Sequence, residues 1–92
     1  MRPGQLEGRE VIDTQAQILG EVCGIEMDVS TWKVTHICVA LSKASIEALG
    51  YKKPFLGTVD VHLPVEAVKM VKDVVTLNKS IMEIKNLVEL HK

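Results

Sequence analysis

Aromatic residues are nearly absent from this chain of 92 residues, which has one Trp, one Tyr and one Phe. A core therefore has to be built from Val, Ile, Leu and Met, and β-branched aliphatic side chains favour strands. A chain of this length buries about 60 to 65% of its unfolded surface, which is enough for one modest core. We therefore expect a single, mainly β domain over residues 1–92.

Long apolar runs are also lacking. No segment approaches the roughly eighteen consecutive apolar residues of a membrane span, and the polar start of the chain has no apolar signal segment. Two cysteines are too few for a disulfide framework, and free Cys in a reducing compartment behaves as a small buried hydrophobe. These absences predict a cytoplasmic protein without membrane insertion, with free thiols at Cys23 and Cys38.

An excess of charge of one sign is missing as well. The 11 basic and 12 acidic residues give a net charge of −1, and no cluster of like charges compensates locally. Binding to phosphate backbones needs a basic surface, so nucleic-acid binding is disfavoured. The mean hydropathy of +0.17 leaves more apolar surface than one small core can hide, which predicts a homodimer or another protein-binding face.

The most informative pattern lies between residues 18 and 29, where one long strand pattern changes its hydrophobic phase. Apolar side chains fall on even positions up to Val22 and on odd positions from Ile25 onward. Because side chains alternate across a strand, a change of phase at Cys23 and Gly24 indicates an inserted residue, a β-bulge, which glycine favours. A bulged strand bends sharply, and such bends turn the corners of small barrels.

The flanking segments predict a meander. A first strand is expected at residues 10–13, and a β-branched strand at 34–41 should pair antiparallel with the bent strand. If the turn centres between residues 30 and 31, the numbers of paired residues sum to about 61 in an antiparallel ladder. This register sets Cys23 near Cys38.

Turn and cap signals define the remaining elements. Ser42 as N-cap and Gly50 after the last turn enclose a short helix, and the alternating strand at 58–63 ends at Pro64. Residues 65–74 fit a helix by the spacing of their valines, or a single turn followed by a hairpin, which we favour.

A C-terminal helix is predicted over residues 80–90, because Ser80 and Glu83 form a capping box. The apolar stripe of this helix packs either on its own domain or against a second copy across a two-fold axis. The dimer-interface candidates on this stripe are Ile81, Ile84, Leu87 and Val88.

The order of these segments resembles the PRC-barrel family over residues 7–77. The family's opening G-x-x-V-x-D is matched by GREVID at 8–13, and its following I-G-x-V run by ILGEV at 18–22. Pro64 matches the proline that begins a later segment, and DVVTL at 73–77 matches the penultimate strand. Lys72 departs from the pattern, since family members often have glycine there.

The resemblance implies a small PRC-type β-barrel of about six short antiparallel strands with a short connecting helix and a C-terminal helix. It also implies a non-catalytic protein without a cofactor. Small stand-alone archaeal members include cell-division adaptors that bind SepF, the membrane anchor of the FtsZ ring, and this is the function that the resemblance favours. The alternative is a ribosome-assembly role like that of RimM, for which this chain lacks a basic face.

Three aromatic side chains are candidates for partner binding, since aromatic anchors in exposed loops are frequent hot spots. Trp32 lies in a polar turn, where it either folds over the end of the barrel or is offered to a partner. Tyr51 and Phe55 lie in the loop that follows the short helix and carry the same two alternatives.

The sequence contains few indications of metal-binding or catalytic residues. A small metal site could use Cys23, His36 and Cys38, since the last two share one strand face and soft ligands suit zinc, but no C-x-x-C or H-x-x-x-H spacing is present. Acid and base pairs assembled from Glu26, Asp28, Asp60 and His62 lie on the polar side of their strands and are expected to be solvated. We therefore predict no catalytic residues and no enzyme activity.

Overall fold

The computed structural model describes residues 5–51 and 59–90, and within the helix at the end it describes side chains up to residue 87. In this part of the chain six strands form one sheet with the order β4-β3-β2-β1-β6-β5. The elements in chain order are β1 (Glu10–Ile12), β2 (Ile18–Asp28), β3 (Lys33–Leu41), α1 (Lys43–Ala48), β4 (Asp60–Pro64), the 3-10 turn η2 (Val65–Ala67), β5 (Val68–Val71), β6 (Val75–Leu77) and α2 (Ile81–Leu90).

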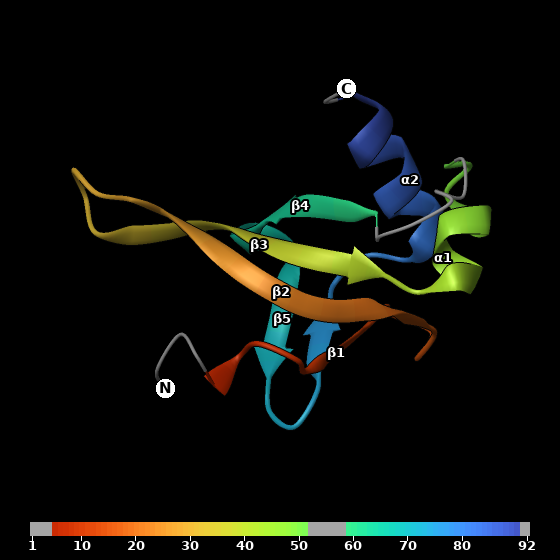
Figure 1. The fold of residues 1–92 in the computed structure, drawn as a ribbon, viewed down its shortest axis with the longest axis horizontal. Coiled ribbons are helices and arrows are strands. Elements are labelled where there is room, and N and C mark those ends of the chain that lie inside the picture. The colour runs from red at the N-terminus through yellow and green to blue at the C-terminus, as the bar shows by residue number, and fades with distance from the viewer. Residues whose placement is uncertain (1–4, 52–58, 91–92) are drawn as a thin grey trace.

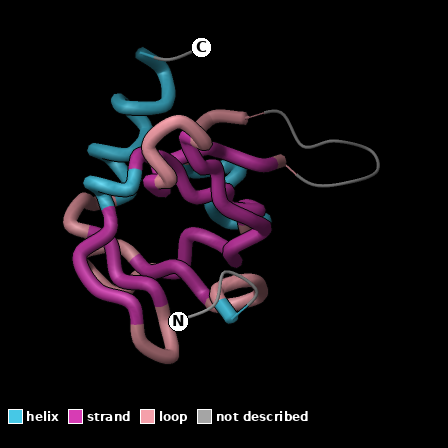
Figure 2. The backbone as a smooth tube through the Cα atoms, turned by 90° about the vertical axis from the view of Figure 1, so that its left-hand side faces the viewer, coloured by secondary structure: helices cyan, strands magenta, loops and turns pink. Residues whose placement is uncertain are grey.

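The sheet curls into a barrel because its two edge strands follow one another in the chain. Only η2 separates β4 from β5, although these strands stand at opposite ends of the sheet order. Figure 2 shows the strands wrapped around a common centre, and both helices lie at the end of the molecule away from the β2–β3 hairpin (Figures 1 and 2). The predicted small, mainly β barrel with two short helices is confirmed.

One strand pair differs from the all-antiparallel expectation. β1 pairs with β6 in parallel, with Val11 opposite Val75. Both valines are fully buried, so this pairing brings two core side chains together within the sheet. Parallel strands cannot be joined by a tight hairpin, so paired parallel strands lie far apart in the sequence. No local sequence signal therefore indicates that β1 pairs with β6.

The β2–β3 ladder has the predicted register. Gly20 pairs with Leu41 and Asp28 with Lys33, so at both ends of the ladder the residue numbers sum to 61 as expected, and a second shift between Glu26 and Met27 compensates the first. The ladder shifts between Val22 and Gly24, so Cys23 is the extra residue of a bulge. The predicted bulge is therefore confirmed.

A second irregularity corrects the predicted phase of the first half of β2. Val11 pairs with Gly20 but Ile12 pairs with Ile18, which leaves Leu19 as an additional residue in the β1–β2 ladder. Leu19 is consequently fully buried while Ile18 is 50% exposed, the reverse of the even-numbered pattern. Two shifts within one strand give β2 its strong bend.

Residues 65–74 adopt the favoured alternative. They form the single turn η2 and then β5, which pairs antiparallel with β6 as a hairpin. The turn between these strands lacks glycine, and the guanidinium of Arg9 donates a hydrogen bond to the backbone carbonyl of Lys72 within it. Arg9, which directly precedes β1, thus stabilises the turn between β5 and β6.

Both helices begin at their predicted caps. The Ser42 hydroxyl accepts a hydrogen bond from the Ser45 N–H, and Gly50 follows α1 with a φ of 79°. At α2 the Ser80 N–H donates to Glu83 Oε1 and the Glu83 N–H donates to Ser80 Oγ, a reciprocal capping box. The hydrogen bonds from the Ser80 backbone and hydroxyl lower the pKa of Glu83.

A buried carboxylate connects α2 to the barrel. Asp13 is 1% exposed, and its Oδ1 accepts hydrogen bonds from the backbone N–H groups of Gln15 and Gln17. Its Oδ2 accepts a third from the Ile81 N–H, at the first turn of α2. One side chain therefore shapes the β1–β2 turn and also satisfies a donor at the start of a helix far along the chain.

The core is aliphatic throughout, as the scarcity of aromatic residues predicts. Every strand except β5 contributes buried residues to it, together with one face of each helix, and Val68 and Val71 of β5 pack against it half-buried. Its buried members are Val11, Leu19, Val22, Ile37, Val39, Leu41, Ile46, Leu49, Val61, Leu63, Val75, Leu77 and Ile84.

The two glycines of the bent strand have different roles. A Cβ placed on Gly20 would overlap the backbone carbonyl of Ala40 on the paired strand. A Cβ on Gly24 would meet nothing within 4 Å, so the bulge does not need a glycine on steric grounds. Gly20, where the two backbones approach closely, is therefore the position in β2 that requires glycine.

Gly20→Ala is expected to lower the free energy of unfolding by about 1–3 kcal/mol, because overpacking against backbone forces the two strands apart. Gly24→Ala is the matched control in the same strand and is expected to change it by less than about 0.5 kcal/mol. Urea denaturation of both variants measures the difference. Equal stability of the two variants would contradict this account of β2.

Candidate functional site

Cys23 and Cys38 form a disulfide, which corrects the expectation of two free buried thiols. Their Cα atoms are 5.2 Å apart, within the usual range for a disulfide. The bulge is the physical reason, since the extra residue turns Cys23 to the outer face beside Cys38. Cys23 is exposed and Cys38 is half-buried. The predicted proximity of the two residues is confirmed.

Polar side chains surround this disulfide on the outer face of three adjacent strands. β4 contributes His62, which pairs directly with Cys38, and Asp60, which pairs with Ala40. β2 contributes Glu26, which pairs with His36 of β3. We call the disulfide and these four side chains the polar face: Cys23, Glu26, His36, Cys38, Asp60 and His62.

The polar face contains the three residues that the sequence offered as an alternative metal site, but in a different grouping. The ligand atoms of Cys23, Cys38 and Asp60 lie within 4.8 Å of one another. His36 is outside this group, with its Nδ1 3.0 Å from the Thr35 hydroxyl and 3.8 Å from Glu26 Oε2. The expected triad with His36 is therefore not assembled, and Asp60 occupies the third place. Sequence reasoning missed Asp60 because its neighbourhood depends on the β3–β4 pairing.

An ion pair between His62 Nδ1 and Glu26 Oε1 crosses the polar face from β4 to β2. Both side chains are about half-exposed. The contact holds His62 by one ring nitrogen, next to the disulfide of the intervening strand. The position of His62 next to Cys38 follows from a strand pairing that the sequence pattern did not indicate.

The end of the β2–β3 hairpin extends away from the barrel (Figure 1), and its apolar side chains are exposed. Trp32 is 77% exposed and Val29 is 72% exposed, and Met27 precedes them at 40%. We call these three residues the hairpin tip. Of the two alternatives for Trp32, the structure has the ring in solvent and not folded over the barrel. Ile25 still packs against the core, whereas the next odd-numbered apolar positions, Met27 and Val29, are exposed.

Local hydrogen bonds fix the turn that presents the hairpin tip. Asp28 Oδ1 accepts from the Ser30 hydroxyl at 2.7 Å and from the Ser30 N–H at 2.9 Å, an Asx-type turn. Trp32 itself has a φ of 58°, a left-handed conformation that is uncommon for residues other than glycine. The hydrogen bonds from the Ser30 side chain and backbone lower the pKa of Asp28.

The other predicted contact residues lie in different surroundings. Tyr51 is half-buried and packs against the core, and Phe55 lies outside the described residues. On α2, Ile84 has no accessible surface, while Ile81 and Leu87 are half-buried against the same core. The helix backbone includes Val88, whose side chain lies outside the described part of the chain. Ile81 and Leu87 are the described members of the stripe that a second copy could reach.

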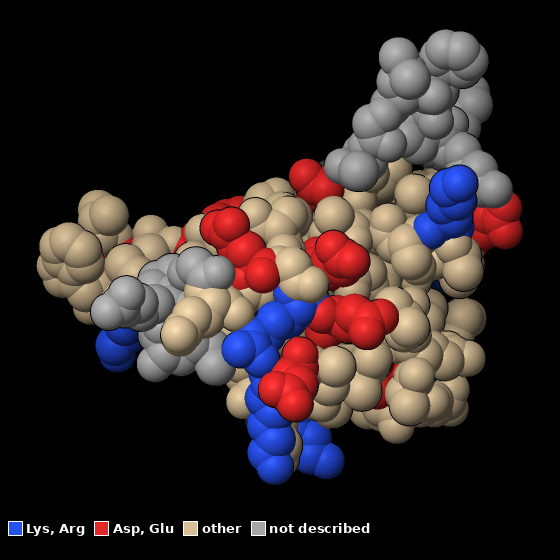
Figure 3. Space-filling view, turned by 60° about the horizontal axis from the view of Figure 1, so that its bottom comes forward, with Lys and Arg blue, Asp and Glu red and all other residues tan. Residues whose placement is uncertain are grey.

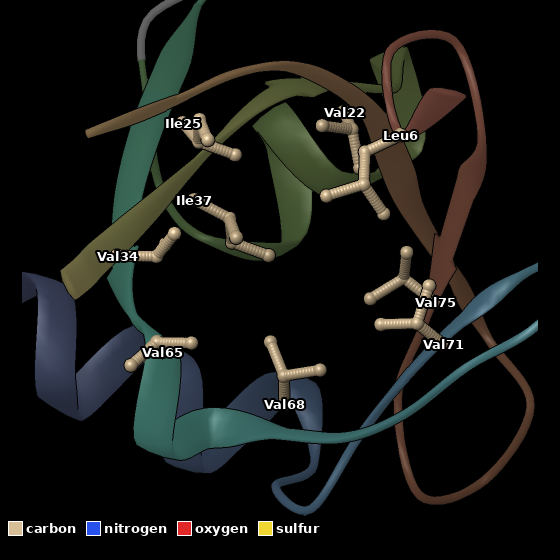
Figure 4. A pocket seen from close by; sticks show the side chains of 9 residues that line it. All are labelled: Leu6, Val22, Ile25, Val34, Ile37, Val65, Val68, Val71 and Val75. Carbon is tan, nitrogen blue, oxygen red and sulfur yellow. The ribbon is translucent and has the colours of Figure 1, made fainter. Parts of the chain in front are cut away.

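A cavity of about 170 Å³ lies within the barrel. Figure 4 shows its nine lining side chains directed toward a common hollow. All of them are aliphatic, so the cavity offers neither an acid or base nor a polar group to orient a substrate. The lining residues are Leu6, Val22, Ile25, Val34, Ile37, Val65, Val68, Val71 and Val75.

The charged surface is mixed. Figure 3 shows acidic and basic side chains next to one another, with uncharged residues at the protruding end of the molecule on the left. Among the described residues, no helix combines the length and the apolar character needed to cross a membrane.

The sheet order, the bulged second strand and the terminal helix define a small PRC-barrel-like fold. No protein-family model and no curated protein matches the chain. Among solved structures, it is similar to a protein of Pseudomonas aeruginosa described as the 16S ribosomal RNA processing protein RimM, with a TM-score of 0.56 and 19% sequence identity. The match covers 85% of this chain and 43% of that chain, so this chain spans less than half of the RimM structure. At this identity the likeness concerns the fold alone.

Replacing Ser30 with Ala is expected to raise the pKa of Asp28 toward its ordinary value of 3.8, because the hydroxyl bond is the largest cause of the lowering. A carboxylate with a lowered folded pKa stabilises the fold above its unfolded pKa, and this contribution is lost as the pH falls through the folded value. The turn should therefore loosen at a higher pH in Ser30→Ala than in the wild type. Carboxyl NMR titration measures the pKa, with Ser80→Ala as the control. An unchanged Asp28 pKa in Ser30→Ala would contradict the role of this bond.

Proposed function

We propose that this chain is a non-catalytic protein-binding module whose docking element is the hairpin tip. The observation that supports it most directly is the exposure of Trp32 at 77% and Val29 at 72%, on a hairpin that projects from the barrel. Trp is strongly enriched among residues that dominate binding energy. Hydrogen bonds between Ser30 and Asp28 order the turn that precedes this Trp, which lowers the backbone entropy lost on binding.

The composition of the cavity supports a non-catalytic function. Catalysis needs polar groups within hydrogen-bond reach of a reacting atom, and the nine residues that line the cavity are all aliphatic. The titratable side chains of the polar face lie on an open strand surface, where water competes for them. Neither place combines enclosure with acid and base groups.

For the partner, we propose a division protein of the SepF type, as the resemblance to stand-alone archaeal PRC-barrel proteins implies. This makes the chain a cytoplasmic adaptor in archaeal cell division. The mixed charge of the surface is compatible with an apolar protein contact and gives no attraction to a phosphate backbone.

A role in ribosome assembly is the second candidate, and the likeness in fold to RimM favours it. That protein is described as acting in the processing of 16S ribosomal RNA. The hairpin tip would then contact a ribosomal protein, since the net charge of −1 is unsuited to RNA.

Homodimer formation remains part of the proposal. Ile81 and Leu87 are half-buried, and Met82 on the same helix is 65% exposed, so α2 retains apolar surface for a second copy. Light scattering across a dilution series measures the mass. A constant monomer mass at all concentrations would remove the dimer from the proposal.

Trp32→Ala is expected to weaken binding to SepF by about 30-fold or more, which corresponds to about 2 kcal/mol for a hot-spot residue. Met70→Ala is the matched control, because Met70 is also an exposed apolar side chain but lies on β5, outside both the hairpin tip and the proposed dimer surface of α2. Its affinity should stay within about twofold of the wild type. Biolayer interferometry with immobilised SepF, and in parallel with small ribosomal subunits, measures both variants.

The two arms of this experiment separate the candidates. Binding to SepF that depends on Trp32 supports the cell-division adaptor, and Trp32-dependent binding to the ribosomal subunit supports the second candidate instead. Equal binding by Trp32→Ala and the wild type would reject the hairpin tip as the docking element, whatever the partner.

A further inference from the structure

Three adjacent strands bring metal-ligand atoms together at one point of the polar face. Cys23 comes from β2, Cys38 from β3 and Asp60 from β4, and their ligand atoms lie within 4.8 Å of one another. Thiolates and a carboxylate are ligands that zinc accepts in tetrahedral sites. Because each residue is held by a hydrogen-bonded strand, little backbone ordering is required for the three to act together.

His62 stands next to Cys38, although its ring atoms lie outside the group that the other three residues form. It pairs directly with Cys38 across the β3–β4 ladder and shares an outer face with Asp60, two residues earlier in the same strand. Its Nδ1 is already paired with the Glu26 carboxylate. Histidines that bind zinc commonly donate their second ring N–H to a carboxylate, which fixes the ring and its tautomer. Glu26 is in the position for that second contact, and Nε2 is the ring atom available to a metal.

The disulfide is not needed to keep β2 and β3 paired. The ladder continues on both sides of the cysteines, from Gly20 opposite Leu41 to Asp28 opposite Lys33. Cys23 is exposed, so a reductant can reach the bond. The two cysteines can therefore separate by the small distance that a shared metal requires without unfolding the sheet.

We propose that the dithiol form of this chain binds one zinc ion through Cys23, Cys38 and Asp60, with His62 as the fourth ligand. Reduction by a small dithiol adds two electrons and two protons to the disulfide, and the reductant becomes a disulfide itself. Zinc then forms bonds to two thiolates, and the two thiol protons pass to solvent. The disulfide form and the zinc form exclude one another, since the same sulfur atoms serve both.

Cobalt(II) titration of the reduced chain tests the site, because cobalt(II) replaces zinc in tetrahedral thiolate sites and absorbs visible light. The expected result is one equivalent of cobalt with thiolate charge-transfer absorption, which disappears when zinc is added. The oxidised chain should show no such absorption. Far-UV circular dichroism of each variant before titration establishes that it is folded.

Three variants test the ligand set. Cys23→Ser, Asp60→Asn and His62→Ala should each weaken cobalt affinity by about tenfold or more. His36→Ala is the matched control, since His36 lies on the same face but pairs with Pro64 and not with a ligand residue across the β3–β4 ladder, and its affinity should equal that of the wild type. The proposal is overturned if the reduced chain gives no thiolate–cobalt absorption. It is also overturned if Asp60→Asn and His62→Ala bind cobalt as tightly as His36→Ala.

Discussion

The bend of β2 is the constraint on which the rest of the structure depends. This strand has 11 residues and pairs with β1 on one edge and β3 on the other, so it belongs to both halves of the barrel. A flat strand could not serve both, because alternation would send half of its apolar residues to solvent. The extra residues at Leu19 and Cys23 let Leu19, Val22 and Ile25 all face inward or pack against the core.

The same bend separates the two surfaces on which the functional proposals rest. Cys23 turns outward as the inserted residue, and this brings it beside Cys38 on the polar face. Beyond the bulge, β2 and β3 leave the barrel together and end in the hairpin tip with Trp32. The cavity inside the barrel is lined by aliphatic side chains alone (Figure 4).

Much of the fold could be predicted from local signals in the sequence. The phase change at Cys23 indicated the bulge, the position of the turn indicated the register of β3 against β2, and the pair Ser80 and Glu83 marked the start of α2. What could not be predicted depends on contacts between distant segments. The parallel β1–β6 pair and the hydrogen bond from the Ile81 N–H to Asp13 are of this kind.

The candidate site divides in the same way. Side-chain alternation in β3 predicted that His36 and Cys38 share one face. The position of the β2–β3 turn predicted that Cys23 lies near Cys38. The places of Asp60 and His62 follow from the pairing of β4 with β3, for which the sequence offers no register signal because a long connection separates the two strands. The disulfide was missed because two cysteines in a small chain were interpreted by composition and not by their register.

Deletion of Cys23 tests the central role of the bend most directly, because it removes the inserted residue and restores strict alternation in β2. The register of Val22 opposite Val39 and Ile25 opposite Ile37 would be kept, so Ile25 would still face inward and the variant would remove the bend alone. Cys23→Ser keeps the length of the strand and serves as the control. The account predicts that the deletion variant loses the dispersed two-dimensional NMR spectrum and the cooperative urea transition that the control retains. A deletion variant as stable and as well folded as Cys23→Ser would contradict it.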